Sequence, residues 1–374
     1  MLTPDAPADL AGGGQLAALP GRRGHRLWQA WAVTQIETHL RLSEGREEGS
    51  AIVALNLKKI YKEVEAVRGV SFEVKTGEIF GFLGPNGAGK STTISMLCTL
   101  VSPTEGSARV AGFDVVADQA RVRQRIGLVF QETTLDDYLT ATENLRFHAE
   151  LYGVPRDVVA GRLRQVLQMV DLWERRDGLV QTFSGGMKRR LEIARGLLHA
   201  PSVLFLDEPT VGLDPQTRSH IWSYIQELRR REQITIFLTT HYMDEAEYCD
   251  RLAIIDNGVL VAVDTPEALK GSIGEDRVEL RTADDQRAIE QLAQHFRVHA
   301  QISEGAVTFH VPGGEQFVPK LFAELEVPIR SIRVARPTLD DVFMNYTGRT
   351  IRDAEASGSD RLRADPWMRY RGRR

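Results

Sequence analysis

The sequence predicts an α/β fold followed by a small α+β domain, and three observations support this prediction. An apolar run typical of a short buried strand (78–83) and a helical segment (93–100) lie on either side of a glycine-rich turn. Further apolar strands, such as 203–206 and 234–239, alternate with helical segments, as they do in α/β folds. After residue 275, shorter strands and helices follow one another in a separate α+β pattern.

The glycine-rich turn has the composition and setting of a phosphate-binding loop. Its residues are Gly84, Pro85, Asn86, Gly87, Ala88, Gly89, Lys90, Ser91 and Thr92. Glycines let consecutive backbone N–H groups turn inward on an anion, and the start of the helix adds its positive dipole end. Lys90 can then reach the terminal phosphates of a nucleotide, and the Ser91 hydroxyl is placed to bind Mg²⁺. A glycine-rich turn with a chance lysine is the alternative, and the strand and helix beside it argue against that.

Composition limits the classes of function. A chain of 374 residues suits two domains, or one large domain with an appendage, and a net charge of −4 gives no overall attraction to nucleic acid. Its two cysteines, Cys98 and Cys249, neighbour no Cys/His cluster, which argues against a zinc site and favours a reducing compartment. No window has the roughly 18 apolar residues that span a bilayer.

Both ends of the chain are predicted to be largely disordered. Residues 1–50 are rich in Gly, Ala and Pro, with a short helix expected over 27–42, and an arginine cluster at 22–26 only weakly resembles an export signal. Residues 349–374 are polar and Arg-rich. A solvated tail is the simpler interpretation of that composition, and attraction to anionic lipid is the alternative.

The first domain is predicted to cover residues 51–270. Segments 52–55 and 66–74 alternate like strands of an antiparallel layer, and Tyr61 between them can either pack or stack on a nucleotide base. Strands are expected at 107–112 and 126–130. Gln131 follows the second of these, at the strand end where α/β folds place ligands. It can hold a metal-bound water, or it is a solvated loop residue.

A helix-rich block over residues 140–200 interrupts the alternation and suggests a subdomain. It contains the segment Phe183, Ser184, Gly185, Gly186 and Met187, followed by a basic amphipathic helix. Ser184 is a suitable N-cap for this helix. The exposed amides at such a helix start can bind an anion, and a simple capped helix is the alternative.

Two carboxylates emerge from the apolar strand 203–206. Asp207 is suited to bind Mg²⁺ through water, and Glu208 is suited to polarise a water for attack on a γ-phosphate. Asp214 ends a turn and is expected to cap the next helix. His241 lies just beyond strand 234–239, where it either has a structural role or donates a hydrogen bond to transition-state charge.

The second domain is predicted to cover residues 275–348. Strands are expected at 278–281, 307–311 and 329–334, and helices at 285–296, 316–325 and 339–346. This domain contains no catalytic constellation.

These stretches, in this order, resemble the ATP-binding cassette (ABC) proteins, over about residues 52–270. The P-loop NTPase fold of the family comprises a RecA-like core, an antiparallel β layer and a helical subdomain. The segments that match its motifs are Tyr61 (A-loop), Gly84–Thr92 (Walker A), Gln131 (Q-loop), Phe183–Met187 (signature), Val203–Asp207 with Glu208 (Walker B), Gly212–Asp214 (D-loop) and His241 (H-loop). The departures are Phe183 for Leu and Met187 for Gln.

The Met-ending signature and the segment 337–343 resemble ATPase subunits of daunorubicin-type drug exporters, and related branches export sodium or polysaccharides. The resemblance implies ATP and Mg²⁺, with Ser91, Gln131 and Asp207 at the metal and Glu208, His241 and Lys90 in catalysis. Two copies would pair head to tail, each signature segment and Asp214 meeting the partner's ATP. A membrane permease docked near residues 131–137 would hold the dimer at the cytoplasmic face of the membrane.

Two rival functions remain at this point. A soluble ABC ATPase acting on DNA or ribosomes usually carries two cassettes, zinc modules or coiled coils, and none is evident here. A nucleotide sensor without hydrolysis is disfavoured by Asp207, Glu208 and His241.

Overall fold

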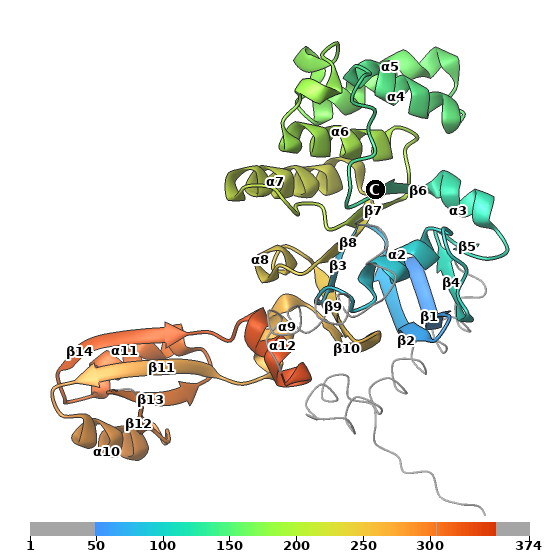
Figure 1. The fold of residues 1–374 in the computed structure, drawn as a ribbon. Coiled ribbons are helices and arrows are strands. Elements are labelled where there is room, and N and C mark those ends of the chain that lie inside the picture. The colour runs from blue at the N-terminus through green and yellow to red at the C-terminus, as the bar shows by residue number, and fades with distance from the viewer. Residues whose placement is uncertain (1–48, 304, 349–374) are drawn as a thin grey trace, which may run out of the picture. The chain divides into compact units, whose positions relative to one another are not determined.

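The computed structural model describes residues 49–303 and 305–348 (Figure 1). The N-terminal appendage, its expected helix and the Arg-rich tail lie outside this range. The described chain forms two compact units, the first ending at Pro266 and the second running from Glu267 to Tyr346.

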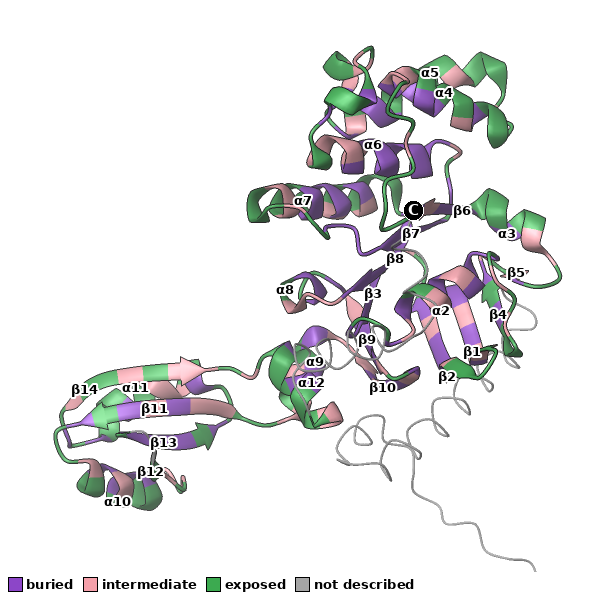
Figure 2. Ribbon diagram, viewed as in Figure 1, coloured by how far each residue is buried: buried purple, intermediate pink, exposed green. Residues whose placement is uncertain are grey.

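A central six-stranded sheet forms the middle of the first unit, in the order β10-β9-β3-β8-β7-β6. Four of its strands are parallel neighbours: β3 (Ile79–Leu83), β8 (Thr235–Thr240), β7 (Val203–Asp207) and β6 (Ile126–Val129). β9 (Arg251–Asp256) is parallel to β3, and β10 (Val259–Asp264) pairs antiparallel with β9. Every residue of β3, β7 and β8 is buried, as expected for parallel strands covered on both faces (Figure 2).

A second sheet in this unit is antiparallel, in the order β2-β1-β4-β5. Its strands are β1 (Ser50–Tyr61), β2 (Val64–Lys75), β4 (Glu105–Val110) and β5 (Phe113–Asp114). Phe72 of β2 lies between the sheets, its ring centroid 5.8 Å from that of Phe80 and 5.9 Å from that of Phe237. The predicted antiparallel layer is therefore confirmed, and aromatic packing joins it to the central sheet.

Helices occupy most of the segment between β6 and β7. They are α4 (Ala141–Leu151), α5 (Arg156–Met169), two short 3₁₀ turns (Trp173–Arg175 and Val180–Thr182) and α6 (Gly185–Leu197). Thr140 and Glu143 form a capping box at the start of α4. The apolar sides of α4, α5 and α6 share a buried core, so the predicted helical subdomain is confirmed (Figure 2).

The remaining helices of the first unit flank the strands. They are α2 (Lys90–Leu97), α3 (Gln119–Arg125), α7 (Pro215–Glu232) and α8 (Met243–Ala246). The helix after the glycine-rich turn was expected at 93–100, but it begins at Lys90 because Gly89, at φ 106°, already acts as its N-cap.

The second unit contains a four-stranded antiparallel sheet in the order β12-β13-β11-β14. Its chain order is β11 (Asp276–Thr282), α10 (Asp285–His295), β12 (Gln301–Ser303), β13 (Ala306–Val311), α11 (Gly314–Glu324) and β14 (Ile329–Ala335). Helices α9 (Pro266–Ser272) and α12 (Leu339–Thr347) precede and follow this βαββαβ arrangement. The predicted fold class, an α/β domain followed by a small α+β domain, is confirmed, although the short strand β12 was not predicted.

Candidate active site

Close backbone packing fixes the glycine-rich turn that follows β3. The Gly84 N–H donates to Thr240 O at 3.2 Å, which ties the turn to the end of β8. A Cβ on Gly84 would overlap the carbonyl oxygen of Ile255, and a Cβ on Gly89 would lie 2.6 Å from Ala66 O. Only glycine fits at these two positions, so the sequence folds here into a compact cradle of backbone amides.

Lys90, the first residue of α2, points into this turn. Its ammonium donates to Gly84 O at 2.7 Å and Pro85 O at 3.2 Å, and lies 3.0 Å from Glu208 Oε1. Its side chain is only 4% exposed. A cation held at this depth by backbone oxygens and one carboxylate is suited to compensate the charge of a terminal phosphate.

Asp207 and Ser91 lie together at the end of β7. Ser91 Oγ donates to Asp207 Oδ1 at 3.2 Å, and Thr239 Oγ1 of β8 donates to the same atom at 2.6 Å. The sequence analysis did not single out Thr239. In the sequence, Thr239 is one of two threonines in the largely apolar run 234–239, the other being Thr235, and nothing there distinguishes the two.

Glu208 is the centre of the polar cluster. Its backbone adopts φ 45°, and its N–H donates to Thr239 Oγ1 at 3.0 Å. Gln131 Nε2 donates to Glu208 Oε2 at 3.0 Å, and His241 Nδ1 lies 3.3 Å from Oε1. Of the predicted site residues, the structure thus brings together Lys90, Ser91, Gln131, Asp207, Glu208 and His241.

Opposing effects set the charge of Glu208. Burial raises the pKa of its carboxyl, but the neighbouring His241 ring and the Lys90 ammonium lower it more, so the pKa falls below its ordinary value. The carboxyl is therefore ionised at neutral pH, as an acceptor for a water proton must be. The buried Nδ1 of His241 faces Glu208 Oε1 at 3.3 Å and has no well-aligned hydrogen-bond partner within the described chain.

The oxygen atoms of Ser91 and Asp207 fit Mg²⁺, which prefers hard oxygen donors and retains several waters. No group of three or more His, Cys, Asp or Glu side chains within residues 49–303 and 305–348 forms an all-protein metal site. A Mg²⁺ site made of one hydroxyl and one carboxylate, with phosphate oxygens and water as the remaining ligands, is consistent with this observation. Gln131, which is also predicted at the metal, donates from Nε2 to Glu208 Oε2.

A second group of predicted site residues gathers at the start of α6. Met187 N–H donates to Ser184 Oγ at 3.3 Å, and Asp214 caps α7 through Thr217 N–H at 3.0 Å. A Cβ on Gly186 would overlap the Thr217 methyl group, so the two helix starts pack directly together. Phe183 is buried in the core and anchors this segment.

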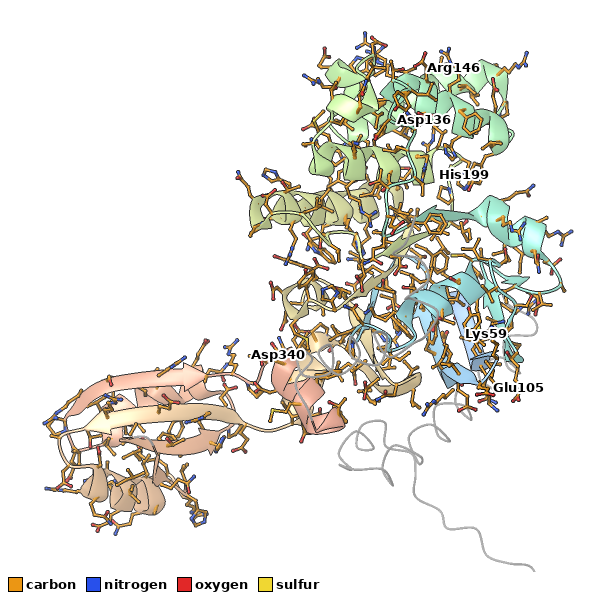
Figure 3. The ribbon with its side chains drawn as sticks, in the orientation of Figure 1. Lys59, Glu105, Asp136, Arg146, His199 and Asp340 are labelled. Carbon is orange, nitrogen blue, oxygen red and sulfur yellow. The ribbon has the colours of Figure 1, made fainter. Side chains whose placement is uncertain are left out.

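Within the described ranges, no hydrogen bond or ion pair joins the Ser184–Asp214 group to the Lys90–Glu208 group. Tyr61 is likewise separate from both. It ends β1 with 43% of its surface exposed, and Lys59 Nζ lies 5.1 Å from its ring centroid. Figure 3 labels Lys59 on this sheet, together with Glu105 of β4.

Comparisons with known proteins agree with this geometry. The model of the ABC transporter family matches residues 67–211, and that of the ATP-binding protein DrrA1-3-like C-terminal domain matches residues 265–347. The chain is 41% identical to the linearmycin resistance ATP-binding protein LnrL of Bacillus subtilis, over 80% of this chain and 99% of that protein. It belongs to the ATP-binding subunits of ABC transporters.

Two further relatives of this ABC subunit are named for drug resistance and for export. The daunorubicin/doxorubicin resistance ATP-binding protein DrrA of Streptomyces peucetius is 38% identical, over 81% of this chain and 94% of the relative. The Nod factor export ATP-binding protein I of Ralstonia nicotianae is 39% identical, over 79% of this chain and 94% of the relative. The resemblance to the daunorubicin-type branch is therefore confirmed.

Solved structures match more than half of this ABC subunit. A component of the cbiONQ transporter complex of Clostridium perfringens has a TM-score of 0.57 and 28% identity, covering 60% of this chain and 92% of its own. A dimeric ATP-binding cassette bound to ADP and Pi has a TM-score of 0.52 and 26% identity, covering 57% of this chain and 98% of its own. The chain is accordingly an ATPase of the ABC type. Over residues 49–303 and 305–348, none of its helices has the length and hydropathy needed to cross a bilayer.

Proposed function

We propose that this subunit hydrolyses ATP within a dimer of identical chains and thereby drives a separate membrane permease that exports an antibiotic or related drug. The observation that carries the proposal is the convergence of Lys90, Gln131 and His241 on Glu208. A general base needs a positioned, ionised carboxylate beside the terminal phosphate site, and Glu208 has that setting.

Each polar side chain has a distinct role in the proposed reaction. Glu208 accepts a proton from the attacking water, and Gln131 and His241 orient the groups around it. The turn Gly84–Thr92 binds the phosphates through its amides, and Lys90 compensates their charge. Ser91 and Asp207 would hold Mg²⁺, together with Gln131, and the ion would supply electrostatic stabilisation of the developing charge.

A second copy would complete the nucleotide site. The start of α6 presents Ser184 and two glycine amides, the composition that binds anions, yet among the described residues no hydrogen bond or ion pair joins Ser184 to Lys90. In the proposed head-to-tail dimer, Phe183–Met187 and Asp214 of one copy face the ATP on the other copy's phosphate loop, and Tyr61 stacks on the base. The family relationship to dimeric cassettes supports this arrangement.

The permease would dock near residues 131–137. This segment is tied to α4, because Asp136 N–H donates to Asn144 Oδ1 at 2.9 Å (Figure 3 labels Asp136). Tyr138 beside it is 82% exposed and offers an aromatic contact. Such docking would place the dimer on the cytoplasmic face of the membrane. The names of the resistance relatives support export of a drug.

Turnover of Glu208→Gln tests the proposal. We expect ATP binding within about twofold of wild type and kcat lowered by a factor on the order of 100 or more, because the isosteric amide cannot accept the water proton. Lys90→Ala is the contrasting variant, since it should weaken ATP binding itself. Wild-type kcat in Glu208→Gln would overturn the role of Glu208 and with it the proposed mechanism.

A further inference from the structure

Arg189 of α6 is a buried cation that the proposed reaction does not use. Its side chain is 7% exposed. The guanidinium donates from Nε to Pro209 O at 2.6 Å, from Nη2 to Asp207 O at 3.1 Å and from Nη1 to Phe130 O. One planar side chain therefore binds backbone carbonyls from two segments that are far apart in the sequence.

These three carbonyls belong to the immediate neighbours of the polar centre. Asp207 and Pro209 precede and follow Glu208, and Phe130 precedes Gln131. Gln131 in turn donates to Glu208 Oε2 at 3.0 Å. The guanidinium thus fixes the backbone on both sides of Glu208 and the start of the loop that carries its amide partner.

The backbone of Glu208 needs such support. Its φ of 45° lies in the left-handed region, which a residue with a Cβ rarely adopts unless surrounding contacts hold it there. Thr239 Oγ1 accepts the Glu208 N–H from one side. Arg189 holds the carbonyls on either side of the residue, so the two contacts together determine where the carboxylate points.

Glu192, one helical turn beyond Arg189, extends the link to the far end of the same loop. It is fully buried, with Oε2 3.2 Å from Arg189 Nη1. Its Oε1 accepts the Thr134 N–H at 2.7 Å, and Arg195 Nη1 donates to Thr134 O at 3.2 Å. Segment 130–134 is consequently bound at both ends to one face of α6 by charged groups.

We propose that Arg189 is a positioning residue that holds Gln131 and Glu208 in register and passes displacement of segment 130–134 to the carboxylate. The inference rests on the proposed function of Glu208 and concerns how α6 controls it. A buried, hydrogen-bonded guanidinium has a rigid planar geometry, so a shift of Phe130 relative to α6 must strain its bonds to Asp207 and Pro209. Gln131 would then lose its alignment with Glu208.

Arg189→Lys tests the proposal in the full-length chain. Lysine retains the charge beside Glu192 but cannot donate in the fixed directions that the three carbonyls require. We expect kcat for ATP to fall at least tenfold, with KM and the affinity for a fluorescent ATP analogue within about twofold of wild type. Unchanged kcat would overturn the inference, as would a loss that appears only in nucleotide affinity.

Arg162→Lys is the matched control. Arg162 is also a partly buried arginine that binds backbone carbonyls, donating to Leu197 O at 2.7 Å and Leu198 O at 3.1 Å at the opposite end of α6. Its kcat should stay within twofold of wild type. An equal loss of kcat in Arg162→Lys would mean that α6 is merely destabilised, and would contradict a specific role for Arg189.

Two further variants separate the remaining outcomes. If Arg189→Lys does not fold, Arg189→Gln takes its place, because Glu192 then keeps Arg195 as an ionic partner, with Arg195 Nη2 3.7 Å from Glu192 Oε1. The same kcat loss is expected there, and wild-type kcat would refute the inference. Glu208→Gln is assayed in parallel. If Glu208→Gln hydrolyses ATP at the wild-type rate, the proposed function is wrong. If Glu208→Gln is inactive and Arg189→Lys has wild-type kcat, only the role inferred for Arg189 is wrong.

Discussion

Glu208 occupies an unfavourable backbone conformation that its neighbours make tolerable. A non-glycine residue with φ near 45° costs about 1–2 kcal/mol. Its N–H finds an acceptor in Thr239 Oγ1, and the same hydroxyl donates to Asp207 Oδ1 at 2.6 Å. One threonine on β8 thereby positions both carboxylates of the site.

Thr239→Val should separate this positioning from ordinary packing. Valine has nearly the same shape but leaves the Glu208 N–H without its acceptor and removes the shorter of the two hydrogen bonds to Asp207 Oδ1. We therefore expect a loss of about 1–3 kcal/mol in unfolding free energy and at least a tenfold fall in kcat. Thr235→Val on the same strand is the control, since Thr235 Oγ1 accepts from Gly77 N–H at 2.9 Å, outside the polar cluster. Urea titration and steady-state kinetics measure both, and equal kcat losses in the two variants would contradict the assignment.

His148 on α4 should make the protein sensitive to acid. Burial, with a smaller effect of Arg195, lowers the pKa of its imidazole to about 4, whereas an unfolded histidine titrates near 6.5. The unfolded chain therefore binds a proton that the folded chain does not, and stability is lost as pH falls from 6.5 towards 4. Between pH 7 and pH 5 this amounts to up to about 2 kcal/mol.

The variant His148→Gln removes that loss, so its unfolding free energy should decline less between pH 7 and pH 5 than that of wild type. His220→Gln, at an exposed position on α7, is the control and should retain the wild-type pH dependence. The same decline in wild type and His148→Gln would show that other groups account for the acid sensitivity.

At the scale of elements, the starts of α6 and α7 form one packed unit. Gly185 and Gly186 are the first two residues of α6, and the Thr217 methyl of α7 lies against Gly186. Thr217 cannot rotate away freely, because its Oγ1 donates to Asp214 Oδ2 at 2.6 Å. The packing therefore fixes the orientation of Ser184 relative to Asp214.

Gly186→Ala should break this packing and Gly185→Ala should not. A Cβ at 186 displaces Thr217 and breaks its bond to Asp214, for an expected loss of about 1–3 kcal/mol. A Cβ at 185 meets only Leu213 Cδ2 at 3.5 Å, an ordinary contact, and alanine favours a helix over glycine. Thermal unfolding compares the two variants, and equal stabilities would be inconsistent with the packing described.

The sequence predicted those parts of the site that lie in continuous stretches. Gly84–Thr92, Asp207, Glu208 and the Ser184 cap each follow from local strand, turn and helix chemistry. Arg189 escaped prediction because its partners are backbone carbonyls of two other segments, which leave no side-chain pattern. The order of strands in each sheet also depends on long-range pairing that residue periodicity does not contain.

At the scale of the whole molecule, the first unit presents two complementary half-sites. One holds Lys90 and Glu208 at the ends of β3 and β7, and the other holds Ser184 at the start of α6. The free backbone amides at a helix start stabilise a bound anion, so the start of α6 needs a phosphate from another site to use them. In the proposed dimer, two copies would exchange these half-sites and complete both at once, which would account for a single set of motifs in each chain.

The mass of the Glu208→Gln variant in solution, measured by light scattering after size-exclusion chromatography with and without Mg-ATP, tests this account most directly. Because we expect the variant to bind ATP without turning it over, we predict a dimer of twice the chain mass with ATP and a monomer without it. Ser184→Arg, which places a bulky cation at the start of α6, should remain monomeric in the same background. A Glu208→Gln protein that binds ATP and stays monomeric at every concentration would contradict the central claim.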